Sequence, residues 1–247
     1  MMALIACIRQ NLGHVPCLYS LILYGSLARG DFLPGTSDVD FFIVLEDGTE
    51  PEEVLSEIRP VLKESSEPLN PFEIYVAWEL LSNLRDPLNF GYPYKFLTVY
   101  QADFRENHIV IIGEEIVGLL PEYEIGEILP RRLEGILRNL EHFSGNRKML
   151  HILAGETARL MAFLNGSSLK KEDVLRKLEE LGDEEAWKIY RSYLAGRKTE
   201  FSAKFLRDFV AKRVETMKKT KTSLPGLSAF QHDGQRQGND HNRDSNV

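Results

Sequence analysis

Two short segments of the chain combine residue types that can hold a phosphate group and a divalent cation. Gly25 and Ser26 directly follow an apolar run, and Asp38 and Asp40 lie at the start of the next one. Glycine lets a backbone approach a ligand closely, and a helix that starts here offers unpaired N–H groups to an anion. We therefore predict a phosphate seat at Gly25 and Ser26, with the Ser26 hydroxyl as a further donor.

The two aspartates are spaced for a shared metal ion. Side chains alternate along a strand, so Asp38 and Asp40 point to one face while Val39 and Phe41 point to the other. Adjacent carboxylates repel each other unless a cation lies between them. Mg²⁺ takes one or two carboxylates and completes its shell with water and phosphate oxygens. The pair therefore predicts a Mg²⁺ site.

A third acid on a later strand completes the predicted site. Glu73 lies in an otherwise apolar run, where an unpaired carboxylate would be costly. We predict Glu73 either as a third metal ligand, with two Mg²⁺ ions favoured over one, or as the base that takes a proton from an attacking hydroxyl. Three acids from two strands beside a phosphate seat indicate in-line phosphoryl or nucleotidyl transfer by metal ions. Arg29 and Ser37 are predicted to help bind the nucleotide, although a plain surface position for Arg29 fits the pattern about equally well.

The elements that must position these residues follow from the hydrophobic pattern. Continuous apolar runs bounded by turn residues predict buried strands, and apolar residues three or four apart predict helices. The alternation of the two in the first half of the chain predicts a mixed sheet with helices. The predicted strands are 18–24, 39–45, 72–78 and 108–112, and the predicted helices are 2–12, 51–63 and 94–104, with a short helical turn after Gly25.

From about residue 122 the pattern becomes entirely helical. Short turns that contain glycine separate the predicted helices and favour an antiparallel bundle. These helices are expected at 126–143, 147–164, 170–181, 183–195 and 200–219. The polar stretch that follows lacks periodicity and core-forming residues. We predict an α+β protein with a mixed-sheet domain at 1–121, which would carry the transfer site, a helical bundle domain at 122–220 and a disordered tail at 221–247.

The composition of the chain indicates its cellular compartment and excludes some classes of binding partner. The 247 residues carry a formal net charge of −7, which disfavours nucleic acid as a partner because a phosphate backbone rewards a basic surface. Cys7 and Cys17 are too few for a disulfide framework, and no run of about 18 apolar residues predicts a membrane span. We expect a cytoplasmic protein, a monomer or weak dimer, without a membrane partner.

The glycine-serine pair, the acid pair and the later acid described above resemble the signature of the DNA-polymerase-β-like nucleotidyltransferase superfamily. The order of elements after Glu73, with segments 96–120 and 149–196, is similar to that of streptomycin and spectinomycin (aminoglycoside) adenylyltransferases, and within the second segment residues 157–174 carry the likeness. This resemblance implies the superfamily's catalytic domain fused to a C-terminal helical bundle, with nucleotide and acceptor in the cleft between them. It also implies that Lys171, in preference to Lys170, contacts phosphate from the bundle.

The resemblance implies a Mg²⁺-dependent nucleotidyltransferase. Such an enzyme would move a nucleoside monophosphate, with AMP from ATP favoured, to a hydroxyl of a small-molecule acceptor and release pyrophosphate. Two alternatives stay open: a protein acceptor, as in AMPylating antitoxin-like nucleotidyltransferases, and a nucleotide-binding regulatory module without catalysis. Without the resemblance, Lys171 would be interpreted as part of a charged, solvated helix start.

Overall fold

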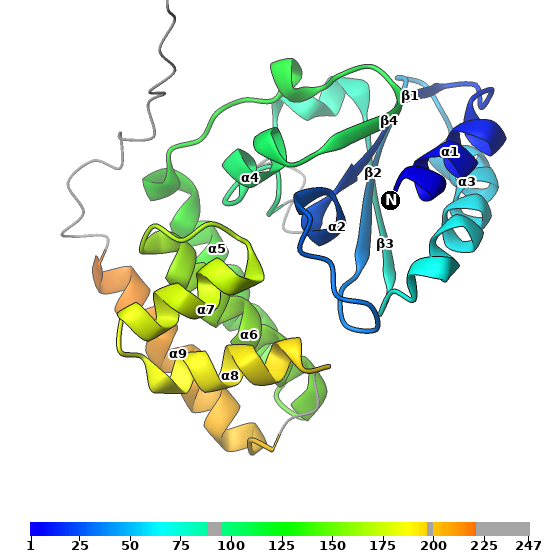
Figure 1. Ribbon diagram of the computed structural model, residues 1–247. Coiled ribbons are helices and arrows are strands. Elements are labelled where there is room, and N and C mark those ends of the chain that lie inside the picture. The colour runs from blue at the N-terminus through cyan, green and yellow to red at the C-terminus, as the bar shows by residue number, and fades with distance from the viewer. Residues whose placement is uncertain (88–94, 197–199, 221–247) are drawn as a thin grey trace, which may run out of the picture.

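The computed structural model describes residues 1–87, 95–196 and 200–220, and a four-stranded mixed sheet lies at the centre of its N-terminal part (Figure 1). β1 is antiparallel to both of its neighbours, β2 and β4, whereas β2 is parallel to β3. Along the sheet the order is β3 (Ile74–Leu80), β2 (Val39–Leu45), β1 (Leu18–Tyr24) and β4 (Ile109–Gly113). The apolar runs of β1 and β2 fit their central positions, and both strands have the predicted bounds.

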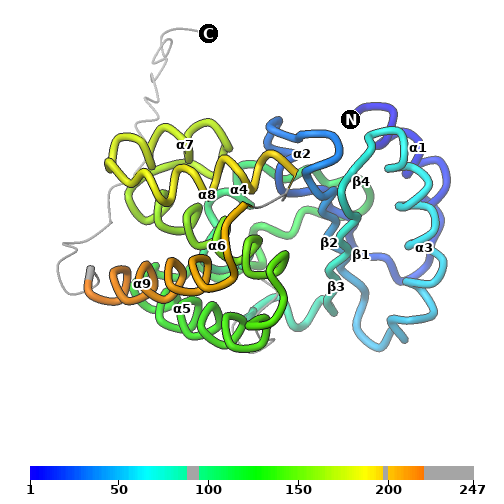
Figure 2. Tube along the Cα trace, turned by 90° about the horizontal axis from the view of Figure 1, so that it is seen from below, coloured from blue at the N-terminus to red at the C-terminus, as the bar shows by residue number. Residues whose placement is uncertain are grey.

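Helices cover one face of this sheet, and the helical C-terminal region lies on its other side. Figure 2 shows α1 and α3 packed together on the outer face, with the sheet between them and helices α5 to α9. The elements of the N-terminal part are α1 (Met2–Leu12), α2 (Gly25–Arg29), α3 (Pro51–Ser66), α4 (Gln101–Glu106) and the 3₁₀ turns η1 (Glu67–Leu69), η2 (Leu81–Arg85) and η3 (Val117–Leu119). This arrangement leaves one face of the sheet for a site shared with the C-terminal region.

The two faces of the sheet bury different side chains of the same strand. Phe41 and Ile43 of β2 belong to the core formed with α1 and α3. Phe42 belongs to a second core on the opposite face. Because side chains alternate along a strand, Asp40 lies on the Phe42 side. The carboxylate is therefore directed away from α1 and α3 and toward the helical region.

Most of the other predicted elements differ from the structure by one to three residues at an end, and two differences lie close to the predicted site. β3 starts at Ile74 rather than at residue 72, because its ladder with β2 begins only where Val39 pairs with Ile74. The helix predicted at 94–104 is shorter: α4 starts at Gln101, and residues 95–100 form turns in which the Tyr100 N–H donates to the Lys95 carbonyl at 2.9 Å. Residue 94 lies outside the described residues.

The C-terminal region is a helical assembly around α6. This helix contacts both α8 and α9 closely, and its buried residues include alanines and a glycine that allow close packing. The helices are α5 (Ile125–His142), α6 (Arg147–Leu164), α7 (Lys171–Glu180), α8 (Glu184–Leu194) and α9 (Ala203–Thr220). A mixed sheet with helices followed by a helical region confirms the predicted α+β class.

The core of the C-terminal region extends beyond the predicted domain boundary. Val99 and Tyr100, which precede residue 122 in the sequence, are buried in the same apolar core as α5 to α9. The division at residues 121 and 122 stays a prediction, and the predicted tail at 221–247 lies outside the described residues. No helix in the described part of the chain is both long and apolar enough to cross a membrane.

Candidate active site

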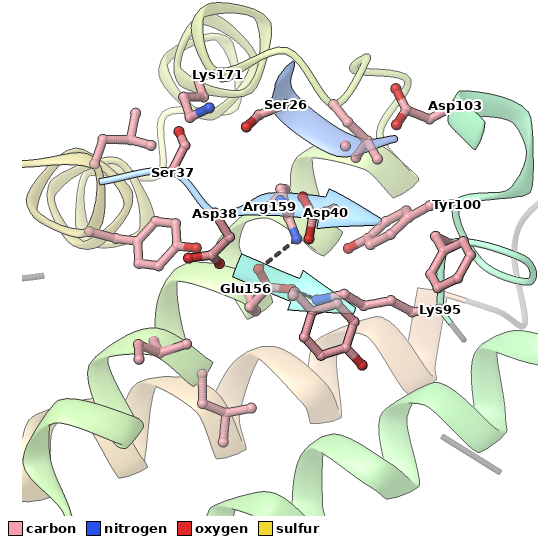
Figure 3. A pocket seen from close by; sticks show the side chains of 18 of the residues that line it. Ser26, Ser37, Asp38, Asp40, Lys95, Tyr100, Asp103, Glu156, Arg159 and Lys171 are labelled. Carbon is pink, nitrogen blue, oxygen red and sulfur yellow. Dashed lines mark hydrogen bonds and ion pairs between the residues drawn. The ribbon is translucent and has the colours of Figure 1, made fainter. Parts of the chain in front are cut away.

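A cavity of about 650 Å³ lies between the sheet and the helical region. Its walls come from the ends of β1 and β2, from α2, and from α5, α6, α7 and α8. Figure 3 shows side chains from both halves of the chain around it. All predicted site residues except Glu73 line this cavity, namely Gly25, Ser26, Arg29, Ser37, Asp38, Asp40 and Lys171.

The turn after β1 packs directly against one of the two aspartates. Gly25 has a φ angle of +72°, a left-handed conformation that favours glycine. A Cβ atom at this position would collide with the Asp40 carboxylate. Ser26 follows at the start of α2, is 9% exposed and lines the cavity. The absent side chain at Gly25 therefore allows the predicted phosphate seat to lie next to the predicted metal ligands.

The electrostatic environment of Asp40 combines a like charge with three cations. Burial and the neighbouring Asp38 raise the pKa of Asp40 to about 7, although Lys95, Arg159 and Arg29 act in the opposite direction. A carboxyl group with this pKa is half protonated near neutrality. A cation bound beside it would favour the ionised form. A divalent cation bound by Asp38 and Asp40 would therefore stabilise the ionised form of both carboxylates.

Glu73 has a different environment from the one predicted. It is exposed, precedes β3 and does not line the cavity. The prediction of a costly carboxylate within a buried strand is therefore wrong. The described residues contain no group of three or more His, Cys, Asp or Glu side chains that could hold a metal ion, so Glu73 is not gathered with Asp38 and Asp40 into a three-acid site.

The strand register nevertheless keeps Glu73 close to the edge of the cavity. In the parallel ladder Asp40 pairs with Tyr75, and the Val39 N–H donates to the Glu73 carbonyl at 2.9 Å. Tyr75 lines the cavity, and burial together with the charges of Asp40 and Glu73 raises its pKa. Alternation places Glu73 on the same side of the sheet as Tyr75. A base role for Glu73 stays a prediction.

Arg29 and Lys171 converge on one loop carboxylate. Arg29 pairs with Asp31 at 3.1 Å and with Asp103 at 2.8 Å, and its side chain is 5% exposed. Lys171, the first residue of α7, donates from its backbone N to Asp31 Oδ2 at 2.9 Å and from Nζ to the Asp31 carbonyl at 2.6 Å. Lys170 is exposed and does not line the cavity. Both predicted cations thus reach the cavity while holding carboxylate partners.

Ser37 shapes the loop that leads to the acid pair. Its hydroxyl accepts a hydrogen bond from the Leu33 N–H at 2.9 Å, and its carbonyl accepts one from the Phe72 N–H at 2.9 Å. Ser37 is 6% exposed and lines the cavity. These bonds close the turn between α2 and β2 and fix the position from which Asp38 enters the site.

A buried ionic cluster on the opposite wall was not predicted from the sequence. Glu156 of α6 pairs with Arg159 at 2.5 Å, with Lys95 at 2.8 Å and with Arg132 of α5 at 3.7 Å. Burial raises the pKa of the Glu156 carboxyl, but the three cations outweigh it and hold that pKa well below its ordinary range. The wall that faces the acid pair is therefore an ionised, cation-rich surface.

Part of this cluster has a signal in the sequence. Glu156 and Arg159 are three residues apart on a helix whose other residues are mostly apolar, so the two side chains lie on the same face. A charged pair in such a helix favours a functional or buried ionic site over a solvated surface. Lys95 has no comparable signal, because it lies 61 residues away from Glu156 in the sequence.

Comparison with known proteins agrees with the geometry of the N-terminal part. Residues 2–111, which run from α1 into β4, match the family model described as a nucleotidyltransferase domain. No curated protein matches the chain, and neither comparison supports the narrower resemblance to aminoglycoside adenylyltransferases. Residues 2–111 are therefore similar to a nucleotidyltransferase domain, and this similarity supports transfer of a nucleoside monophosphate in general.

Proposed function

We propose that the protein is a Mg²⁺-dependent enzyme that transfers AMP from ATP to a hydroxyl group of a small-molecule acceptor and releases pyrophosphate. One observation carries this proposal: Asp38 and Asp40 face a cavity whose opposite wall is rich in cations, within and beside a nucleotidyltransferase domain. The cavity volume of about 650 Å³ lies in the range of small-molecule sites. A small acceptor is therefore favoured over a protein acceptor.

The acid pair fits a Mg²⁺ ion. Asp38 and Asp40 supply two carboxylates on one face, and burial together with the like charge of Asp38 raises the pKa of Asp40, effects that a bound cation would offset. Mg²⁺ prefers one or two carboxylates and takes its other ligands from water and phosphate. When bound, it would neutralise charge on the triphosphate. Asp38 and Asp40 would hold it, and their ionised forms would predominate.

The proposed reaction exchanges one bond at the α-phosphorus for another. The acceptor oxygen forms a bond to the α-phosphorus, and the bond from that phosphorus to the oxygen bridging to the β-phosphorus breaks. The electron pair leaves with pyrophosphate. The proton of the attacking hydroxyl passes to Glu73, which stays the proposed base. Ser26 and Lys171 would bind the departing phosphates, because a hydroxyl and an ammonium group donate to phosphate oxygens.

The proposal is tested with the full chain, Mg²⁺, ATP labelled at the α-phosphate and a small-molecule extract. We expect labelled adducts that are heavier by one AMP, together with pyrophosphate. For Asp38→Ala we expect loss of Mg²⁺-dependent nucleotide binding in calorimetric titration. Titration curves that are the same for the wild type and the variant would contradict the assignment of Asp38, and the absence of any adduct would contradict the proposed activity.

Glu73→Gln tests the proposed base separately. Loss of a positioned base costs about 10²–10⁴ in rate, so we expect kcat to fall by that factor while the affinity for Mg²⁺ and ATP stays near the wild-type value. Glu64→Gln is the matched control, because Glu64 is an exposed acid on α3, on the far side of the sheet. A Glu73→Gln variant with wild-type kcat would remove Glu73 from the mechanism.

A further inference from the structure

The charged side chains of the cavity form two clusters. The first contains Arg29 and Lys171, which share Asp31. The second contains Lys95 and Arg132, which share Glu156. Figure 3 shows Lys171 and Ser26 on one side of Asp40 and Lys95 on the opposite side. The cavity therefore offers two separate cationic ends, with the acid pair between them.

Arg159 connects the two clusters. It forms an ion pair with Glu156 at 2.5 Å, and its charge also acts on Asp40 and Lys171. The Lys95 end thus combines three cations with one carboxylate, namely Lys95, Arg132 and Arg159 with Glu156. With all four groups ionised its formal charge is +2, from three positive groups and one negative group. Burial lowers the pKa of Lys95, and the neighbouring Glu156 carboxylate opposes this shift.

This charge balance disfavours a cationic acceptor. The carboxylates that line the described cavity are Asp38, Asp40, Asp103 and Glu156. The first two are the proposed metal ligands, Asp103 pairs with Arg29, and Glu156 is surrounded by three cations. A polycationic acceptor at the Lys95 end would therefore meet net repulsion. An acceptor with a negative group would instead meet cations that are largely shielded from solvent, where ion pairs are stronger than in water. The side chains of Arg132, Arg159 and Lys95 are 7%, 18% and 36% exposed.

We propose that the Lys95 end of the cavity, formed by Lys95, Arg132, Glu156 and Arg159, binds an acceptor that carries an anionic group, a carboxylate or a phosphate, besides its reacting hydroxyl. This inference rests on the proposed function and adds the substrate class to it. The hydroxyl oxygen forms the new bond to the α-phosphorus and gives up its proton. The anionic group stays chemically unchanged and orients the acceptor. Lys95 is a specificity-determining residue in this assignment.

The test separates acceptors by charge rather than by identity. A small-molecule extract is divided by ion exchange into anionic, neutral and cationic fractions, and each is incubated with the protein, Mg²⁺ and ATP labelled at the α-phosphate. Streptomycin is added as a defined polycationic acceptor. We expect AMP adducts from the anionic fraction. Adducts that form mainly from the neutral or cationic fraction, or from streptomycin, would overturn the inference while leaving the proposed activity intact.

Treatment of the anionic fraction with phosphatase distinguishes the two possible anionic groups. Loss of the adduct would assign a phosphate, and its retention would assign a carboxylate. The absence of adducts from every fraction contradicts the proposed function itself, and the inference falls with it. The two failures are therefore distinguishable.

Lys95→Met tests the proposed binding group directly. The Lys95 side chain is 36% exposed, so the variant is expected to fold. Loss of one charge-assisted hydrogen bond should raise the KM for the anionic acceptor about tenfold, with the KM for ATP unchanged. Lys188→Met is the matched control, because it removes the same charge from the exposed face of α8. A raised KM for ATP with an unchanged acceptor KM would place Lys95 at the donor and overturn the inference.

Discussion

Asp40→Asn is expected to lower kcat for nucleotidyl transfer at least about 10²–10³-fold, the range seen when one preorganised electrostatic group is removed from an active site. The amide keeps the size of the carboxyl but carries no charge for a metal ion. Asp38 is then the one remaining carboxylate of the pair that can bind the metal ion beside the triphosphate. The measurement is kcat with saturating Mg²⁺ and ATP. Glu46→Gln, which changes an exposed acid just beyond the other end of β2, should keep wild-type kcat.

The same substitution should stabilise the metal-free protein. Burial and Asp38 raise the pKa of Asp40 from 3.8 to about 7. A carboxyl whose pKa is higher in the folded state lowers stability as pH rises between these two values, because the unfolded chain loses its proton first. At pH 8 the effect is on the order of 2–4 kcal/mol. Asp40→Asn should therefore unfold at a higher temperature than the wild type at pH 8 and at a similar temperature near pH 4.

Thermal unfolding with and without Mg²⁺ completes this test. Mg²⁺ should raise the Tm of the wild type, since a ligand that binds only the folded state stabilises it. It should have little effect on the variant. A variant that keeps wild-type kcat would show that the charge of Asp40 does not contribute to catalysis. A variant that is less stable than the wild type at pH 8 would show that this charge does not destabilise the folded protein.

Glu156→Gln is expected to destabilise the protein by about 3–5 kcal/mol at pH 7, because removal of one partner from a buried ionic cluster leaves the other charges uncompensated. Three cations surround this carboxylate within 3.7 Å. The measurement is urea unfolding. Since the three cations hold the pKa of Glu156 well below its ordinary range, the contribution is present above about pH 4.5 and is lost as pH falls further.

Glu134→Gln provides the control for this effect. Glu134 is an exposed acid on α5, and its substitution should change stability by no more than about 0.5 kcal/mol. If Glu156→Gln shifted stability by less than about 1 kcal/mol, the cluster would not be the desolvated ionic core that its distances describe. The difference between the two variants should shrink as the pH is lowered toward 3.

Much of the fold could be predicted because the spacing of apolar residues within a single strand or helix indicates that element without knowledge of its neighbours. β1 and β2 have the bounds that their apolar runs predict, and α6 has the predicted range 147–164. The bounds of β3 could not be predicted in the same way. It is an edge strand, so only its pairing with β2 decides where it begins, and that pairing starts at Val39 and Ile74.

Local spacing could predict the candidate site only where residues close in the sequence form it, and Lys171 was included through the family resemblance alone. Gly25 and Ser26 follow β1, Asp38 precedes β2 and Asp40 lies within it, and the pairing of these two consecutive strands brings the residues together. The cation-rich wall depends on packing between distant segments, which one sequence does not reveal. Glu73 illustrates the opposite error: an acid among apolar neighbours was interpreted as buried, whereas the start of an edge strand leaves it in solvent.

The Asp31 carboxylate, which Arg29 and Lys171 share, would affect how tightly the site binds an anion and how readily it releases one. Arg29 and the Lys171 ammonium group already hold protein oxygens when no anion is present. Under the proposed function, a phosphate that binds Arg29 and Lys171 would have to displace these oxygens, and its net gain would be the difference between two similar attractions. The Asp31 carboxylate occupies the position at these cations that the anion would take. Such an exchange would keep the affinity for the anion moderate, and it would ease release of the pyrophosphate that the proposed reaction forms.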